Sequence, residues 1–233
     1  MSERPTRRRL YLMRHGSVDY FLPNGTPLPA DSVALNAEGE RQADAAGALF
    51  AQCAVRFDRV LVSGLPRTVQ TAERVLAASA QSLDVEQEPA LREIRGGRLA
   101  DIPPGQIEAA FLGAFRGAPV AEAQRFLGGE SIGELLDRAL PAFERWRQRD
   151  DWQCLLMVLH GGVNRALLST ALAGQRAFFG RLEQLPACIN VLELGDGDEV
   201  VVRAINLAPT QWLQERERYT TMEKLLAQYL RPV

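Results

Sequence analysis

The sequence predicts an α/β fold, a three-layer sandwich with a mostly parallel central sheet, an added antiparallel hairpin and helices on both faces. Short apolar runs alternate with segments of helical periodicity, which implies parallel strands joined by right-handed crossovers. Two later apolar runs flank Gly195-Asp196-Gly197-Asp198, a hairpin signature. An apolar run followed by histidine and glycine occurs twice, as expected of buried strands that end in tight turns.

The first half of the chain supplies two strands and two helices of this prediction. The first strand begins at Leu10 and ends before His15-Gly16, and a loop rich in proline and glycine follows over 21–31. Asn36 is expected to cap the next helix, whose apolar face runs to Cys53. A strand over 59–63 and a helix over 67–78 come next.

The second half begins with an insertion over 94–129, interrupted by proline and glycine, with two short helices expected at 107–115 and 120–126. Ser131 and Glu134 have the spacing of a capping box and start a helix that Pro141 is expected to bend. A strand ending at His160, a helix over 163–173, hairpin strands over 189–194 and 199–205, and a terminal amphipathic helix over 221–230 complete the order.

The composition is that of an ordinary globular chain. Hydrophobic residues make up 46%, charged residues 24%, and the net charge is −2, so neither a nucleic-acid surface nor a membrane partner is expected. We expect one domain over 10–233, with 94–129 as a lid, after a flexible basic tail over 1–9. Three isolated cysteines suggest neither a disulfide framework nor a zinc site, which favours a reducing cytoplasm and no bound metal.

His15 and His160 are the only two histidines of the chain. Ligands of an open α/β sheet bind beyond the carboxyl ends of its strands, so two strand-end imidazoles are expected to point into one crevice. Arg14 precedes the first histidine, and Arg67 opens the helix after Ser63-Gly64-Leu65-Pro66. Two guanidiniums beside a helix N-terminus predict a phosphate site.

A neutral imidazole beside such a site can attack phosphorus and carry the phosphoryl group covalently. The second imidazole can stabilise the charge on the equatorial oxygens, and a carboxylic acid must protonate the leaving alkoxide. Spacing alone does not select this acid among 29 acidic residues.

The Arg14-His15-Gly16 turn, the segment from Ser63 to Ala72, the Leu91-Arg92-Glu93 triplet, Gly129-Glu130-Ser131 and His160-Gly161-Gly162-Val163 resemble the histidine phosphatase superfamily, the phosphoglycerate-mutase-like group. The resemblance runs in order from about Leu10 to Leu207.

This resemblance implies a metal-independent enzyme without cofactors, in which His15 is the nucleophile and Glu93 the acid and then the base. The phosphate pocket would be formed by Arg14, Arg67 and His160. Ser17 and Gly161 are further candidates to bind the phosphate. Family members often carry a hydroxyl residue and an asparagine where this chain has Val18 and Phe21. Ser17 is the candidate to replace one of these polar contacts.

Three functions fit these residues. The first is a phosphomonoesterase acting on a small phosphate ester or a phosphorylated protein. The second is a mutase of the phosphoglycerate type, which the residues after Glu93 disfavour because they lack the histidine-tyrosine-glycine continuation of such mutases. The third is a non-catalytic phosphate-binding protein. A homodimer is left open, and specificity is expected in the segments 20–34 and 94–129.

Overall fold

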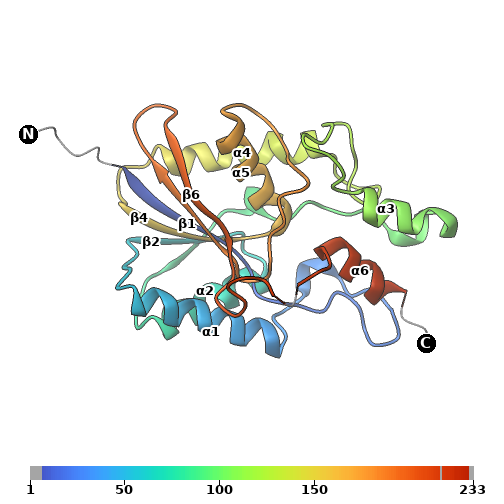
Figure 1. The fold of residues 1–233 in the computed structure, drawn as a ribbon, viewed down its shortest axis with the longest axis horizontal. Helices are drawn as coiled ribbons and strands as arrows, with labels where there is room; N and C mark the ends of the chain where they lie inside the picture. The colour runs from blue at the N-terminus through green and yellow to red at the C-terminus, as the bar shows by residue number, and fades with distance from the viewer. Residues whose placement is uncertain (1–6, 216, 231–233) are drawn as a thin grey trace, which may run out of the picture.

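The computed structural model describes residues 7–215 and 217–230, and its described strands form one six-stranded sheet in the order β3-β2-β4-β1-β5-β6 (Figure 1). The pairs β1–β4, β2–β4 and β2–β3 are parallel, whereas β5 pairs antiparallel with both β1 and β6. The predicted mixed sheet is thus confirmed. The strands are β1 (Arg8–Arg14), β2 (Arg59–Val62), β3 (Val85–Gln87), β4 (Cys154–Leu159), β5 (Ile189–Leu194) and β6 (Val200–Leu207).

Helices cover both faces of the sheet, as a three-layer sandwich requires (Figure 1). Helices α1 (Ala37–Gln52) and α2 (Pro66–Ala78) share one apolar cluster with Met13, Val60 and Val158. Helices α4 (Ile132–Arg147) and α5 (Gly161–Ala173) share another with Leu12, Leu61 and Met157. Successive strand residues therefore point to opposite helical layers, which is why the central residues of these strands are apolar on both faces.

The helix ends follow the sequence signals. The Asn36 side chain accepts a hydrogen bond from Gly39 N at 2.9 Å, and Ser131 with Glu134 forms a capping box at the start of α4. Gly174 ends α5 in the left-handed region at φ 66°. Pro141 lies inside α4, and the helix continues past it to Arg147.

Three expectations need correction. Strand β1 begins at Arg8, so Arg8 and Arg9 belong to the sheet and not to the tail predicted over 1–9, of which residues 1–6 lie outside the described chain. The short strand β3 was not predicted, because Val85-Glu86-Gln87 has no apolar run. The segment 120–126 is not helical, because its backbone bonds elsewhere: Val120 N donates to Phe178 O and Phe126 N to Glu130 O.

A third apolar cluster joins the insertion to the C-terminal segment. Helix α3 (Ile107–Gly113) packs against α6 (Thr221–Tyr229), and the two lie side by side in Figure 1. Phe21, from the loop after β1, stacks edge-on against Tyr229 at 5.8 Å between ring centroids. Short 3-10 helices lie at Ala30–Ser32, Pro89–Leu91, Leu99–Asp101 and Pro104–Gln106. Within the described chain, no helix has the length and apolarity to span a bilayer.

Candidate active site

The two histidines meet because β1 and β4 are adjacent parallel strands in register. Arg14 pairs with Leu159, so the next residue of each strand is a histidine, and His15 N donates to Leu159 O at 2.9 Å. The ring centroids of His15 and His160 lie 5.2 Å apart with an interplanar angle of 64°. The predicted convergence of the two imidazoles is present.

The His15 ring has the geometry of a neutral nucleophile. Its Nδ1 lies 2.7 Å from Gly16 O and donates to this carbonyl, which leaves the lone pair on Nε2. Burial, then the charges of Arg67 and Arg14, hold the pKa of His15 well below its usual value. His15 Nε2 is buried and has no hydrogen-bond partner in the part of the chain that the structure describes.

His160 is oriented by a residue that the sequence reasoning did not assign. Its Nε2 lies 2.7 Å from Ser63 Oγ, at the end of β2, and its Nδ1 is buried without a partner among the described residues. Burial, followed by Arg67, His15 and Arg14, holds the pKa of His160 well below the ordinary value. Both imidazoles are therefore neutral at neutral pH.

Arg14 and Arg67 bring two positive charges to this point. Their side chains are 7% and 1% exposed, and within the described residues neither forms an ion pair with a carboxylate. Arg14 Nη1 donates to Gln184 O at 2.5 Å, Arg67 Nη1 donates to Ala30 O at 2.6 Å, and the Nε of each is buried without a described partner. Two buried guanidiniums that lack a carboxylate are a site for an anion.

The glycine pair after His160 makes room for the groups around it. A Cβ at Gly161 would lie 3.2 Å from Arg165 Nη1 and 3.5 Å from Arg14 Nε. A Cβ at Gly162 would lie 2.6 Å from Glu93 Oε1. Because Gly161 opens α5, its backbone adds the positive end of the helix to the site.

Glu93 lies at the same turn, half-buried. Its Oε1 accepts from Ile94 N and Gly162 N, each at 3.0 Å, and its Oε2 lies 3.2 Å from Gly162 N. The structure thus brings Glu93 to the glycine that follows the His160 turn, beside the predicted phosphate pocket. The carboxylate of Glu130, which is 2% exposed, lies in an ion pair with Arg138.

The turn after His15 packs closely on α1 and α2. A Cβ at Gly16 would lie 2.5 Å from Gly39 O, so only glycine fits this contact. Gly16 N donates to Thr71 Oγ1, and Ser17 N to Gln42 Oε1. Neither partner was predicted.

Ser17 lines a cavity together with Arg14 and His15. Val18 is buried, and Phe21 packs against Tyr229. Neither offers the polar contact that family members have at these positions.

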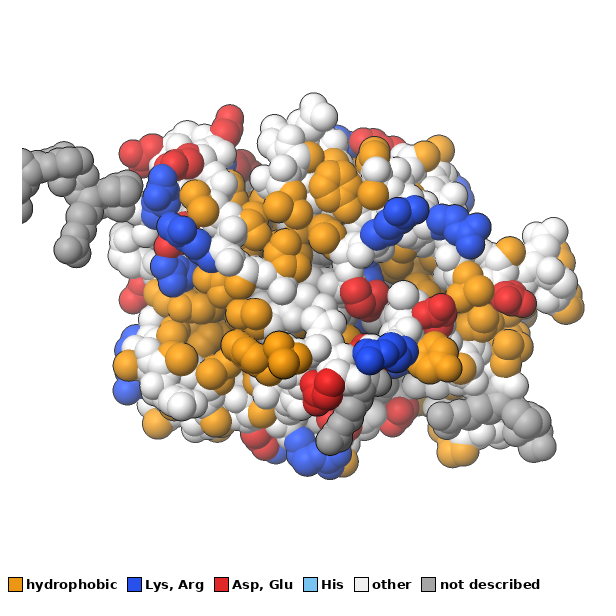
Figure 2. Space-filling view, viewed as in Figure 1, with side chains coloured by type: hydrophobic (Ala, Val, Ile, Leu, Met, Phe, Trp, Pro, Cys, Tyr) orange, Lys and Arg blue, Asp and Glu red, His pale blue; other side chains and the backbone are white. Residues whose placement is uncertain are grey.

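This cavity has a volume of about 280 Å³ and extends from His15 to α6, where Lys224 and Gln228 line it, and to Tyr219 just before that helix. Charged side chains of both signs surround α6 on this face, whereas apolar ones gather around β6 (Figure 2). The C-terminal segment is therefore a wall of this cavity, to which Tyr20 contributes from the segment 20–34. Its amphipathic pattern predicts a helix but does not say where the helix docks.

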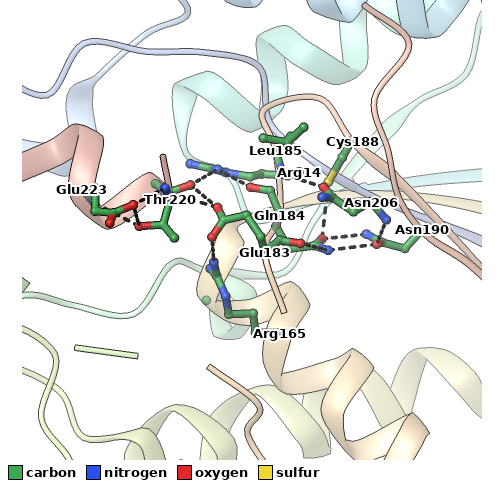
Figure 3. A network of polar contacts seen from close by, with 12 residues as sticks. Arg14, Arg165, Glu183, Gln184, Leu185, Cys188, Asn190, Asn206, Thr220 and Glu223 are labelled. Carbon is green, nitrogen blue, oxygen red and sulfur yellow. Dashed lines mark hydrogen bonds and ion pairs between the residues drawn. The ribbon is translucent and has the colours of Figure 1, made fainter. Parts of the chain in front are cut away.

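A polar network ties α6 to the phosphate pocket (Figure 3). Arg14 Nη1 donates to Thr221 Oγ1 at 3.0 Å, and this hydroxyl donates to Glu183 Oε1 at 2.6 Å. Glu183 also pairs with Arg165, which is 3% exposed, at 3.0 Å. Behind Arg14, Gln184 exchanges side-chain hydrogen bonds with the buried Asn190. Arg14 is thus held from both sides.

Within the described residues, no group of three or more histidine, cysteine, aspartate or glutamate side chains could hold a metal ion. The groups that converge are a nucleophilic imidazole, a hydrogen-bonding imidazole, two guanidiniums and a carboxyl group. This set can bind a phosphate ester and exchange its phosphoryl group with His15.

Comparisons with known proteins agree with this chemistry. The chain is 32% identical over 186 residues to the probable phosphoglycerate mutase GpmB of Serratia proteamaculans (strain 568), covering 77% of this chain and 81% of the relative. It is 26% identical over 197 residues to phosphoglycerate mutase-like protein 4 of Arabidopsis thaliana, covering 83% of each.

Solved structures show the same fold. A putative alpha-ribazole-5'-P phosphatase from Escherichia coli str. K-12 substr. MG1655 superposes with a TM-score of 0.64 and 25% identity, covering 85% of this chain and 96% of that one. Mycobacterial hydrolase 2 superposes with a TM-score of 0.67 and 22% identity, covering 95% and 97%. The sequence profile of the histidine phosphatase superfamily (branch 1) matches residues 10–207, a range that holds both histidines, both arginines and Glu93, and the chain belongs to this superfamily.

Proposed function

We propose that the protein is a phosphomonoesterase that hydrolyses a small phosphate ester through a phosphohistidine on His15. One observation carries the proposal: two buried arginines without a carboxylate partner in the described chain flank the free Nε2 of His15. A phosphate dianion supplies the charge and the acceptor atoms that these groups lack.

The reaction proceeds in two steps. His15 Nε2 attacks phosphorus, the bond to the ester oxygen breaks, and Glu93 in its protonated form donates a proton to this oxygen. Glu93 then takes a proton from water, whose oxygen attacks phosphorus and releases phosphate from His15. Arg14, Arg67 and His160 Nδ1 hold the equatorial oxygens in both steps. No step uses a metal ion.

A mutase of the phosphoglycerate type is the second candidate, favoured by the names of the matched relatives. A mutase must keep water away from the phosphohistidine and grip a second anion. The insertion's Arg95 and Arg125 side chains are 75% and 56% exposed, so they do not provide a buried grip. Release of inorganic phosphate without isomerisation of phosphoglycerate distinguishes the phosphatase from the mutase. If the protein turns over neither kind of substrate, the remaining function is that of a phosphate-binding protein.

The cavity favours a small substrate over a phosphorylated protein. Its volume of about 280 Å³ lies just below the usual range for small-molecule sites, which begins at about 300 Å³. The matched phosphatase from Escherichia coli is named for a phosphorylated riboside, so esters of sugars and ribosides are the first to assay. We place the enzyme in a reducing cytoplasm because its cysteines are all free.

The role of Glu93 gives the sharpest test of this proposal. Glu93→Gln keeps the shape of the side chain but removes the proton donor. We expect kcat/KM to fall on the order of a hundredfold to ten-thousandfold for an alkyl phosphate, whose alkoxide needs protonation. p-Nitrophenyl phosphate has a good leaving group and should lose far less. Equal losses for both esters would refute Glu93 as the acid.

A further inference from the structure

The Arg138 guanidinium, on α4, donates three hydrogen bonds to the loop that carries Glu93 and two to Glu130. Nη1 donates to Ala90 O at 2.8 Å and Arg92 O at 2.7 Å, and Nη2 donates to Glu93 O at 3.0 Å. Nε and Nη2 form a bidentate pair with the Glu130 carboxylate at 2.7 and 2.9 Å. Five hydrogen bonds use the full donor capacity of an arginine.

Glu130 adds a hydrogen bond on the C-terminal side of Glu93, at Arg95. Its side chain is 2% exposed, and its Oε2 also accepts from Arg95 N at 2.9 Å. Burial alone would raise the pKa of Glu130, but the Arg138 guanidinium and the Arg95 N–H outweigh it and lower the pKa. Glu130 is therefore an ionised acceptor and is unsuited to donate a proton.

The hydrogen bonds from Arg138 to Arg92 O and Glu93 O lie in the part of the loop that apolar packing does not fix. Leu91 and Ile94 anchor the loop in the core. Between them, Arg92 is exposed and Glu93 half-buried, and Arg138 bonds the carbonyls of these two residues. The loop thus has its own apolar anchors, and the arginine acts on the peptide units that orient the Glu93 side chain.

We propose that Arg138, held by Glu130, is a positioning residue that sets the Glu93 carboxyl for proton transfer to the leaving oxygen. The inference rests on the proposed role of Glu93. A positioning role differs from a purely structural role in one consequence. Loss of Arg138 should slow the hydrolysis of esters that need a general acid more than the hydrolysis of esters that do not.

The test is a double-mutant cycle between Glu93→Gln and Arg138→Lys, assayed with an alkyl phosphate and with p-nitrophenyl phosphate. Lysine keeps the charge but cannot reach all the acceptors of a planar fork. In the otherwise unchanged enzyme, we expect Arg138→Lys to lower kcat about tenfold or more for the alkyl ester and less than about threefold for p-nitrophenyl phosphate. In the Glu93→Gln background, it should add no further loss.

Arg203→Lys is the matched control, because Arg203 makes a similar two-bond contact with Glu193 on the hairpin, outside the site. It should leave both esters unchanged. If Arg138→Lys does not fold, Glu130→Gln removes the other half of the pair and should show the same selectivity.

Equal losses for the two esters, no loss, or full additivity with Glu93→Gln would overturn the positioning role. If Glu93→Gln itself shows no selectivity, the acid assignment fails first and the positioning role falls with it. The failures of the two proposals are therefore distinguishable.

Discussion

Ser63 determines which nitrogen of His160 faces the phosphate pocket. Ser63 Oγ lies 2.7 Å from His160 Nε2 and 3.1 Å from Thr68 Oγ1, so we expect its single proton to go to the nearer acceptor, Nε2. When Ser63 donates to Nε2, the ring proton lies on Nδ1, which is buried and has no hydrogen-bond partner among the residues that the structure describes. This tautomer presents an N–H to a bound phosphate oxygen.

Ser63→Ala removes this control of the tautomer. We expect the inhibition constant of inorganic phosphate to rise about tenfold, equivalent to about 1.4 kcal/mol, because a buried hydrogen bond to the ring is lost. Ser79→Ala is the control, since Ser79 is an equally buried hydroxyl at the end of α2 that does not contact either histidine. An unchanged inhibition constant in Ser63→Ala would show that His160 is oriented by other groups.

At this scale, the residues that the sequence could identify are those at strand ends. His15, His160 and Arg14 were predictable because adjacent strands end together. Glu93 needed the family resemblance, since nothing in its own segment marks its contact with Gly162. Ser63 and Thr71 act through hydrogen bonds to other turns, and such contacts leave no periodic signal in the sequence.

Among the elements, the N-terminus of α1 has the tightest contact with the His15 turn. A Cβ at Gly39 would lie 2.1 Å from Ser17 O and 2.7 Å from Ser17 N. Gly39→Ala must therefore push α1 away from this turn. We expect a loss of about 1 to 3 kcal/mol in the free energy of unfolding, and a fall in kcat/KM on the order of tenfold to a hundredfold as the turn moves. Urea denaturation and steady-state kinetics measure the two effects.

Gly113→Ala is the matched control for that substitution. Gly113 ends α3, and a Cβ there would meet nothing within 4 Å. Its replacement should leave activity unchanged and stability equal or higher by up to about 1 kcal/mol, as helix propensity predicts. If Gly39→Ala behaved like this control, the close packing of α1 on the turn would not matter for catalysis.

The elements differ in how far the sequence determines them. The long periodic helices and their caps were predicted because their signals are local. The helix predicted over 120–126 does not form, because backbone amides of this segment donate to Phe178 and Glu130 and not to carbonyls one helical turn earlier. The docking of α6 over the pocket could not be predicted, since an amphipathic helix specifies that it has an apolar face but not the partner of that face.

For the whole molecule, the two buried histidines predict how stability depends on pH. Their pKa values in the folded protein lie well below the ordinary value, whereas the unfolded chain takes up protons near pH 6.5. The unfolded state then binds more protons, so stability is lost as pH falls below this point. Each histidine lowers the free energy of unfolding by about 1 kcal/mol per pH unit in this range. Between about pH 7 and about pH 5.5, the two histidines together lower it by about 2 to 3 kcal/mol.

Urea denaturation from about pH 7 to about pH 5.5 measures this loss, above the range in which most carboxylates titrate. A variant with both His15→Gln and His160→Gln should lose most of the dependence. A wild-type curve as flat as that of the double variant would mean that the two histidines titrate in the folded protein as they do in the unfolded chain, which contradicts the lowering of their pKa values by burial.

The central claim, that His15 carries the phosphoryl group, is tested most directly by trapping the intermediate. The enzyme is mixed with a radioactively labelled phosphate ester, quenched within its first turnover and mapped by peptide mass spectrometry. We predict an acid-labile, base-stable phosphoryl group on the peptide that contains Arg14-His15-Gly16, absent from His15→Ala. Label on any other residue, or label that persists in His15→Ala, would contradict the mechanism.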